Sequence, residues 1–129
     1  MKIVADTNTF MAVALDQPER DWLTAVTKEC HLIAPFVLPY EIGNALSALV
    51  KRKVVAGEQA PLVWDAVQKI PVELVRVDIR AALVLAVRFN IYAYDAYFLQ
   101  CALDQRSPLL SLDKRVKRVA ADLNIHLWE

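Results

Sequence analysis

Short apolar runs alternate with longer amphipathic stretches along the chain, and this alternation limits the fold more than any other feature of the sequence. Five runs have the length and composition of buried strands, at residues 2–5, 31–34, 72–77, 109–111 and 125–128. Between them, apolar residues recur at steps of three and four, which is the period of an α-helix. Strands that alternate with helices are typical of an α/β fold with a largely parallel sheet.

Seven helical stretches are expected between these runs, and several have recognisable starts. Pro18 and Pro39 suit the first turn of a helix, because proline lacks the N–H that this turn leaves unused. Residues 42–50 then repeat apolar side chains on one helical face. Asp78 stands where an N-cap is expected, before the apolar positions of the stretch at residues 83–88.

The size and charge of the chain limit the classes of function. The 129 residues suffice for one domain, residues 1–129, and a composition that is 57% hydrophobic and 23% charged predicts a packed core and not disorder. Only two glycines are present, which leaves no glycine-rich phosphate loop. Fifteen basic residues balance fifteen acidic ones, so any binding of nucleic acid must rely on local patches and a metal.

The sequence also predicts a cytoplasmic location. Cys30 and Cys101 are far apart and show no paired spacing, and the first residues do not resemble a signal peptide. No apolar run approaches the roughly 18 residues of a membrane span. We therefore expect two reduced thiols in a cytoplasmic protein that has no membrane partner.

Four acidic residues stand at or near the start of separate predicted helices. Asp6, Asp95 and Asp113 each follow a short apolar run, and Glu41 lies at the start of the third helix. A carboxylate beside a hydrophobic core is costly unless something pairs with it. Two carboxylates ~4 Å apart repel by about 4 kcal/mol at an effective dielectric of ~20, so a cluster must hold protons or a cation. Oxygen ligands of this kind favour magnesium or manganese.

The predicted architecture brings these four acids to one place. In open α/β sheets, ligand sites lie beyond the carboxyl ends of the strands. Asp6 ends the first predicted strand, and Asp113 comes shortly after the fourth. Asp95 and Asp113 each open a helix, where peptide N–H groups favour anions. Asn44 lies one turn after Glu41 on the same helical face. The pattern therefore predicts a metal-dependent phosphoryl-transfer site.

Each acid also has a simpler interpretation. Asp95 and Asp113, taken singly, suit plain N-caps, and Glu41 suits a first-turn partner of the helix dipole. Asp6 fits a purely capping role less well, because it directly follows a buried run. The four together favour a shared site.

Two groups of basic residues are candidates for contact with phosphates. The run at residues 51–53 ends the third predicted helix, where a solvated face with favourable charges at the end of the helix dipole is the preferred explanation over phosphate contact. Lys114 and Arg115 lie beside the proposed site, directly after Asp113. They are therefore the candidates for positioning RNA phosphates, with a solvated face as the alternative.

The large aromatic residues leave two interpretations open. Tyr92, Tyr94 and Tyr97 suit stacking on bases, although packing is the commoner role of such residues. Trp22 and Trp64 suit core or interface anchors. Because the charge is balanced and the composition apolar-rich, we expect another chain to cover part of the surface around these tryptophans.

The acidic positions lie in four sequence blocks with a recognisable order. Residues 6–8, DTN, resemble the opening D-[ST]-[NS] of PIN-domain ribonucleases. Residues 41–46, EIGNAL, resemble the second block of that family, and residues 94–99, YDAYFL, resemble the third. Residues 110–113, LSLD, resemble the fourth, in which threonine or serine precedes the last acid by two positions. The ordered set is more specific than any single block, and it spans nearly the entire chain.

The resemblance implies a three-layer α/β/α sandwich around a central five-stranded, largely parallel sheet, and magnesium- or manganese-dependent cleavage of RNA. The residues that match the catalytic and metal-binding acids of the family are Asp6, Glu41, Asp95 and Asp113. Those that match its supporting polar positions are Thr7, Asn44 and Ser111. Ser111 stands where threonine is usual, and Gln100 and Cys101 replace a pair of small apolar residues. Neither departure removes an oxygen ligand.

Length and cytoplasmic character also resemble the small toxin nucleases of VapBC toxin–antitoxin pairs. This resemblance implies an endoribonuclease that forms a homodimer and pairs with a cognate antitoxin protein, which places an arginine or similar cation among the acids. A non-toxin PIN nuclease and a catalytically inactive PIN-like module that binds RNA or protein remain alternatives. An aspartyl phosphotransferase is disfavoured, because Asn8 occupies the place of its second aspartate.

Overall fold

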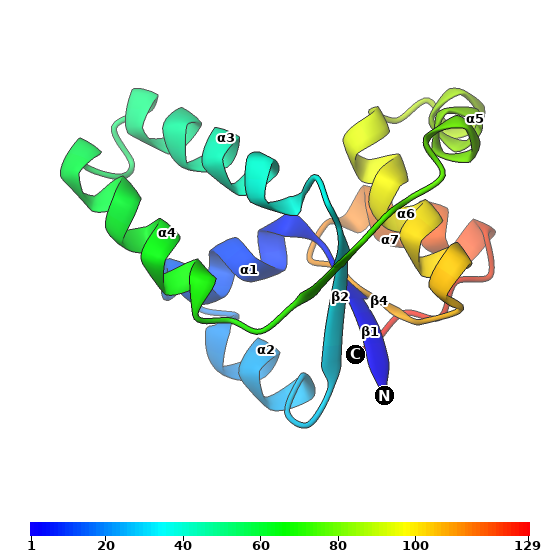
Figure 1. The fold of residues 1–129 in the computed structure, drawn as a ribbon, viewed down its shortest axis with the longest axis horizontal. Coiled ribbons are helices and arrows are strands. Elements are labelled where there is room, and N and C mark those ends of the chain that lie inside the picture. The colour runs from blue at the N-terminus through cyan, green and yellow to red at the C-terminus, as the bar shows by residue number, and fades with distance from the viewer.

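A parallel β-sheet lies between two layers of helices in the computed structural model, which describes residues 1–129 (Figure 1). The strands are β1 (Lys2–Ala5), β2 (His31–Pro35), β3 (Glu73–Val75) and β4 (Leu109–Leu110). Their order across the sheet is β3-β2-β1-β4, and every neighbouring pair is parallel. The α/β sandwich that the sequence predicts is confirmed.

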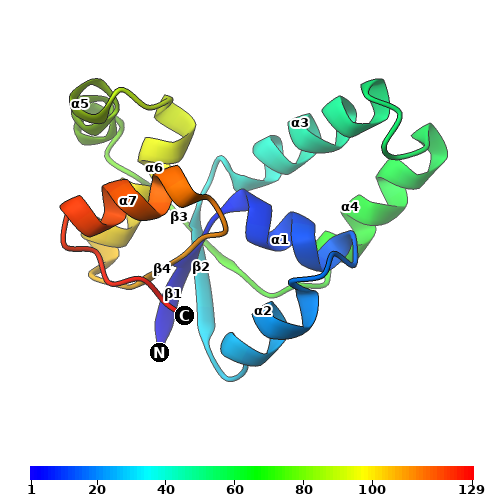
Figure 2. The same ribbon diagram turned by 180° about the vertical axis from the view of Figure 1, so that it is seen from behind.

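Seven α-helices connect the strands, as the apolar periodicity predicts. One layer contains α1 (Thr7–Ala14), α2 (Arg20–Val26), α3 (Leu38–Lys51) and α4 (Ala60–Gln68), with a 3₁₀ turn at Gly57–Gln59 before α4. The other contains α5 (Ile79–Phe89), α6 (Ala93–Gln105) and α7 (Lys114–Asp122) (Figures 1 and 2). The chain runs across the sheet in one direction from β1 through β2 to β3 and then returns in the other direction to β4. Because the crossover connections are right-handed, helices that connect strands in one direction lie on one face of the sheet, and those of the return lie on the other.

The helix starts follow the local patterns of the sequence. Asp78 caps α5, and its carboxylate accepts a hydrogen bond from the backbone N–H of Ala81 at 3.1 Å. Pro39 lies in the first turn of α3. The second helix begins later than its proline suggests, since Glu19 and not Pro18 precedes its first residue.

The sheet has four strands where the sequence predicts five. Residues 125–128 contribute a single bridge, between Leu127 and Leu109. Two backbone bonds of 2.9 Å support it, from Leu109 N–H to the His126 carbonyl and from Trp128 N–H to the Leu109 carbonyl. The segment therefore lies at the edge of the sheet beside β4. It forms no strand there, because β4 is only two residues long and offers no further pairs.

The core fills the space between the sheet and both helical layers. Ile3 of β1 and Ile33 of β2 are fully buried, and Ile42 of α3 and Leu99 of α6 bury their side chains from the two layers. Each such side chain contributes about 1.5–3 kcal/mol through its burial. Cys101 belongs to this core, and burial raises the pKa of its thiol to about 12, so the thiol is unreactive.

No single helix has both the length and the apolar composition needed to cross a membrane. The successive helices α5 and α6 reach that length only together, and the chain bends by 117° between them.

Candidate active site

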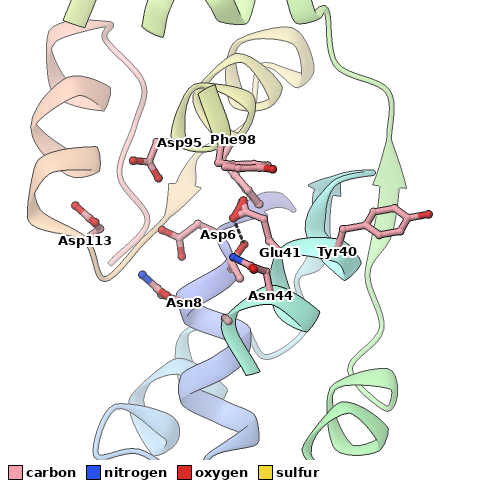
Figure 3. Close-up of a pocket in the computed structure, with 11 residues that line it drawn as sticks. Asp6, Asn8, Tyr40, Glu41, Asn44, Asp95, Phe98 and Asp113 are labelled. Atoms are coloured by element: carbon pink, nitrogen blue, oxygen red, sulfur yellow. Dashed lines mark hydrogen bonds between the residues drawn. The ribbon is translucent and has the colours of Figure 1, made fainter. Parts of the chain in front are cut away.

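A polar cleft of about 220 Å³ opens beyond the carboxyl ends of the strands (Figure 3). The strand order reverses beside β1, since β2 and β3 lie on one side of it and β4 on the other. Ligand sites of open parallel sheets form at such a switch point. The cleft is lined by Asp6, Thr7, Asn8, Tyr40, Glu41, Asn44, Ala45, Tyr94, Asp95, Phe98 and Asp113. The structure therefore brings all four predicted acids together.

Asp6 is the most deeply placed of the acids. It follows β1 directly as the N-cap of α1, and only 7% of its surface is exposed. Its carboxylate accepts hydrogen bonds from the backbone N–H of Thr9 at 3.3 Å and from the hydroxyl of Ser111. Its own N–H donates to the carbonyl of Leu110 at 3.2 Å. Main-chain and side-chain bonds thus fix Asp6 to the end of β4.

The charge of Asp6 has no cationic partner, because neither ion pair of the structure involves an acid of the cleft. Burial raises the pKa of Asp6 to about 7, against the opposing effect of the hydrogen bonds from Ser111 and Thr9. The negative charges of Asp113 and Asp95 raise this pKa further. A buried carboxylate of this kind gains most from a bound cation.

Glu41 presents a second unmet requirement. It lies on α3, and its Oε2 accepts a hydrogen bond from the hydroxyl of Thr7 at 3.1 Å. Its Oε1 is buried and has no hydrogen-bond partner. A buried polar atom without a partner costs about 1–3 kcal/mol. Burial raises the pKa of Glu41, the Thr7 hydrogen bond lowers it, and the charge of Asp95 raises it.

The other two acids come from the second helical layer. Asp95 lies in the first turn of α6, half-buried, and burial followed by the charge of Asp113 raises its pKa while Arg115 lowers it. Asp113 caps α7, and its Oδ1 accepts from the N–H groups of Arg115 at 2.8 Å and Val116 at 3.0 Å. Asp113 is therefore both a helix cap and a lining residue of the cleft.

The three predicted supporting residues occupy different places. The Ser111 hydroxyl donates to Asp6 and accepts from the N–H of Asp113 at 3.0 Å, so it connects two acids of the cleft. The Thr7 hydroxyl orients Glu41. Asn44 lines the cleft from α3, where its amide faces the space between the acids (Figure 3).

The two predicted RNA-binding residues lie at the start of α7, outside the lining of the cleft. The guanidinium of Arg115 donates a hydrogen bond to the backbone carbonyl of Asn90. Arg115 therefore has a partner within the chain. Lys114 is exposed and forms no ion pair, which makes it the freer of the two cations.

Five lining residues are not among the predicted catalytic, metal-binding, supporting or RNA-binding residues: Asn8, Tyr40, Ala45, Tyr94 and Phe98. Of these, Tyr94 alone has a predicted role of another kind, in stacking on bases. Phe98 lies three positions after Asp95, and this helical spacing could have identified it. Asn8 lies within the first sequence block, but that motif does not mark it as a site residue. Tyr40 is the immediate neighbour of Glu41, and no sequence pattern distinguishes it from a packing residue.

The residues of the cleft fit a hard divalent cation. Their donor atoms are oxygens, the unpartnered Oε1 of Glu41 needs a positive partner, and the buried charge of Asp6 needs another. As the side chains stand, no three of them form a ready-made set of metal ligands. A bound ion would therefore draw the carboxylates together.

This fold and this site together define a class of protein: small α/β domains with an acidic cleft at the carboxyl end of the sheet. The family model for the PIN domain matches residues 3–122. The chain therefore belongs to the PIN-domain family. PIN domains are generally nucleases, and these nucleases typically use a divalent metal.

Several solved structures share the fold. PAE2754 from Pyrobaculum aerophilum has a TM-score of 0.70 at 18% identity and covers 92% of this chain and 79% of its own. VapBC2 from Rickettsia felis, bound to a DNA fragment from their promoter, has a TM-score of 0.69 at 16% identity and covers 100% of both chains. FitAcB from Neisseria gonorrhoeae has a TM-score of 0.62 at 13% identity and covers 98% of this chain and 96% of its own. No curated protein sequence matches this chain at a significant level.

Proposed function

We propose that this protein is a magnesium- or manganese-dependent endoribonuclease. One observation carries the proposal: carboxylates from four separate elements face a single cleft, and none of them forms an ion pair within the chain (Figure 3). Membership of the PIN-domain family supports hydrolysis of nucleic acid. The choice of RNA follows the resemblance of the four sequence blocks to PIN-domain ribonucleases.

The residues of the cleft divide into ligands and groups that orient them. Asp6 and Asp95 would be the primary metal ligands, and Glu41 and Asp113 would complete the set. When bound, the cation neutralises charge on the scissile phosphate and lowers the pKa of a water molecule. Ser111 holds the carboxylate of Asp6 through its hydroxyl, as groups around metal ligands commonly do.

The chemistry is hydrolysis of a phosphodiester. Water adds to phosphorus in line with the leaving oxygen, and the bond from phosphorus to the 3′ oxygen breaks, which leaves a 5′-phosphate and a 3′-hydroxyl. The leaving oxygen takes up one proton as water gives up another. Asn44 and Thr7 face the same cleft, where their hydrogen bonds can hold a carboxylate or the attacking water in place.

Cleavage of an unstructured RNA under four ionic conditions tests this function. We expect cleavage with magnesium or manganese, little with calcium because its looser geometry positions water less strictly, and none with a chelator. Asp95→Asn protein, purified identically, controls for contaminating nucleases. Undiminished cleavage in the presence of the chelator would refute the proposal.

We also propose that the protein is the toxin of a type II toxin–antitoxin pair. The support is the shared fold with VapBC2 and FitAcB, which are toxin–antitoxin complexes. The cognate antitoxin would place an arginine or similar cation among the acids and so prevent metal binding. A small reading frame that overlaps this one upstream would provide the candidate partner. The partner proposal fails if that protein binds without reducing nuclease activity.

We further propose that the protein forms a homodimer. The exposed apolar side chains Ile79, Leu83 and Val87 recur every four residues on one face of α5, and Val87 is 82% exposed. Trp22 is 41% exposed and Trp64 is partly buried, so α5 is a stronger candidate interface than the helices of the two tryptophans. Light scattering at micromolar concentration tests the dimer, and Val87→Glu should shift the mass to that of a monomer.

A further inference from the structure

Asp95 is the one acid of the cleft whose carboxylate accepts no hydrogen bond. The carboxylates of Asp6, Glu41 and Asp113 each accept at least one. Asp95 is affected only by its burial and by the charges around it. It lies in the first turn of α6, and the N-cap residue of that helix, Tyr92, forms no capping bond with its side chain. The position of Asp95 is therefore determined by where α6 begins.

The start of α6 depends on the corner that follows α5. Residues 90–92 are all that lies between the two helices, and the chain bends by 117° there. Asn90 turns the chain in the left-handed conformation, with φ 53° and ψ 51°. Its carbonyl accepts a hydrogen bond from the guanidinium of Arg115, and this is the one hydrogen bond between α7 and residues 90–105. Arg115 therefore holds the corner from which α6, and with it Asp95, starts.

Arg115 also belongs to the hydrogen-bond network of the other acids. Its N–H donates to the carboxylate of Asp113 at 2.8 Å. The N–H of Asp113 donates to the hydroxyl of Ser111 at 3.0 Å, and that hydroxyl donates to Asp6. The guanidinium of Arg115 extends this series of bonds to the corner before Asp95. One residue thus connects the helix that carries Asp113 to the segment that carries Asp95.

The charge of Arg115 acts on Asp95 without occupying the cleft. Burial and then the charge of Asp113 raise the pKa of Asp95, whereas the charge of Arg115 lowers it. Arg115 forms no ion pair with either acid and does not line the cleft. Asp95 and Asp113 lie on the same side of the cleft and repel each other in the metal-free protein (Figure 3). The bond from Arg115 opposes the separation of their helices and leaves the cleft free for a cation.

We infer that Arg115 is a positioning residue that holds Asp95 in place beside Asp113 and so sets the affinity of the cleft for a divalent cation. The inference rests on the proposed metal-dependent function, and it gives Arg115 a different role from the RNA contact that its place in the sequence predicts. Arginine suits this role, because its guanidinium has a fixed charge and presents its donors in a rigid fork. A charge-assisted hydrogen bond is about twice as strong as a neutral one.

The sign of the effect on metal binding separates this role from a purely electrostatic one. Removal of a positive charge near a cation site strengthens binding of the cation. Removal of a group that orients metal ligands weakens it. Arg115→Met removes the charge and the hydrogen bond together. Lys114→Met is the matched control, because the exposed Lys114 side chain precedes Arg115 on α7 and forms no ion pair.

Manganese binding to the RNA-free protein is the first measurement, by isothermal titration calorimetry well below the melting temperature of each variant. We expect Arg115→Met to bind manganese about tenfold to a hundredfold more weakly than wild-type protein, the usual loss when a group that orients a metal ligand is removed. Lys114→Met should bind as tightly as wild-type protein or slightly more tightly. Arg115→Lys keeps a charged donor and should recover most of the affinity.

RNA binding is the second measurement, with an unstructured oligonucleotide and with metal saturating for each variant. Arg115→Met should lower kcat while it keeps the KM of wild-type protein and the salt dependence of RNA binding. Lys114→Met should instead raise KM. The slope of its logarithmic affinity against logarithmic salt concentration should fall by about 0.7, the value for one lost phosphate contact on a single strand.

Two results would overturn the inference. One is a manganese affinity of Arg115→Met that equals or exceeds that of Lys114→Met. The other is a rise in KM and a loss of salt dependence as large in Arg115→Met as in Lys114→Met, which would make Arg115 an RNA contact. Either result, together with magnesium-dependent cleavage that Asp95→Asn abolishes, would leave the nuclease proposal standing. Wild-type protein that neither binds manganese nor cleaves RNA with it would instead refute the proposed function, and the inference with it.

Discussion

The acidic side chains at the two ends of the parallel sheet differ in their partners and in their pKa values. At the amino end, Glu73 of β3 pairs with His31 of β2 at 2.6 Å, and the hydrogen bond from His31 lowers the pKa of Glu73, with a further effect of the Lys2 charge. At the carboxyl end, Asp6 is buried among other acids, has no cationic partner, and has a pKa raised to about 7.

This difference shows that surroundings, and not residue type, decide what an acid does in this fold. Glu73 is solvated and paired, so its ionisation stabilises the folded state modestly. Asp6 and Glu41 are desolvated, and their ionisation destabilises the folded protein until a cation arrives. The carboxyl end therefore holds charge that a metal ion, or a cationic side chain of a partner, can compensate. On the proposed function, the same arrangement would serve both metal binding and inhibition by an antitoxin.

The largest expected effect is on catalysis. Asp6→Asn and Asp95→Asn should each reduce magnesium-dependent RNA cleavage at least about a hundredfold, the order of loss for a group that stabilises transition-state charge. Both variants should keep the fold, because asparagine has nearly the same shape as aspartate. Glu73→Gln, at the other end of the sheet, should retain wild-type cleavage. Undiminished cleavage by either aspartate variant would end the assignment of the site.

The second effect is on stability against pH in the metal-free protein. The pKa of Asp6 is about 7 in the folded state and 3.8 in the unfolded chain, so the folded protein holds the proton of Asp6 more tightly. The stability that this proton contributes is fully present below about pH 3.8 and is lost as the pH rises through 7. That contribution amounts to at most about 4 kcal/mol. Urea unfolding in the presence of a chelator should show that, from pH 5 to pH 8, wild-type protein loses stability relative to Asp6→Asn. A pH dependence identical in the two proteins would contradict the comparison.

The third effect is the response to metal. Magnesium or manganese at millimolar concentration should raise the melting temperature, because a ligand that binds only the folded state stabilises it by mass action. About 1 kcal/mol of binding corresponds to several degrees for a domain of this size. The increase should be larger at pH 8 than at pH 5, because the ion competes with protons for the carboxylates. A melting temperature that magnesium leaves unchanged would argue against a metal site.

The smallest effect is expected at the amino end. Glu73→Gln should lower the melting temperature only slightly, because the pair with His31 is exposed. The pKa of Glu73 is lowered from 4.5 in the folded state, so the ionised side chain contributes stability above pH 4.5, and this stability is lost as the pH falls through the lowered pKa. The pH dependence is therefore opposite in direction to that of Asp6. If Glu73→Gln lost as much stability as ionising Asp6 is expected to cost, the different exposure of the two acids would not explain their different energetic effects.

Local patterns made much of the fold predictable. The helical period and the strand runs identified seven helices and β1 correctly, because neighbouring residues largely determine these features. Residues 125–128 are apolar enough for a strand, but strand formation requires a partner of matching length, and β4 supplies a single pair at Leu109. The length of a neighbouring strand is a property of the tertiary structure.

The candidate site likewise has features that the sequence predicts and features that only the folded structure reveals. Asp6 and Asp113 were found because a strand end and a helix start are visible in the sequence, and the topology of parallel sheets places such residues together. The unpartnered Oε1 of Glu41 and the hydrogen bond of Arg115 to Asn90 were not predictable. Each depends on which group reaches a given atom after packing, and residues distant in sequence decide that.

The bonds between Asp6 and the end of β4 also determine when the cleft can exist during synthesis. β1 is made before the other three strands of the sheet, yet Ser111, which donates to Asp6, is added 105 positions after Asp6 in the chain. Until β4 and the residues after it have left the ribosome, β1 lacks its neighbour on one side and Asp113 is absent. A growing chain therefore carries an unfinished cleft, and whatever chemistry the cleft performs begins only after Asp113, the last of its lining residues in the sequence, has been added.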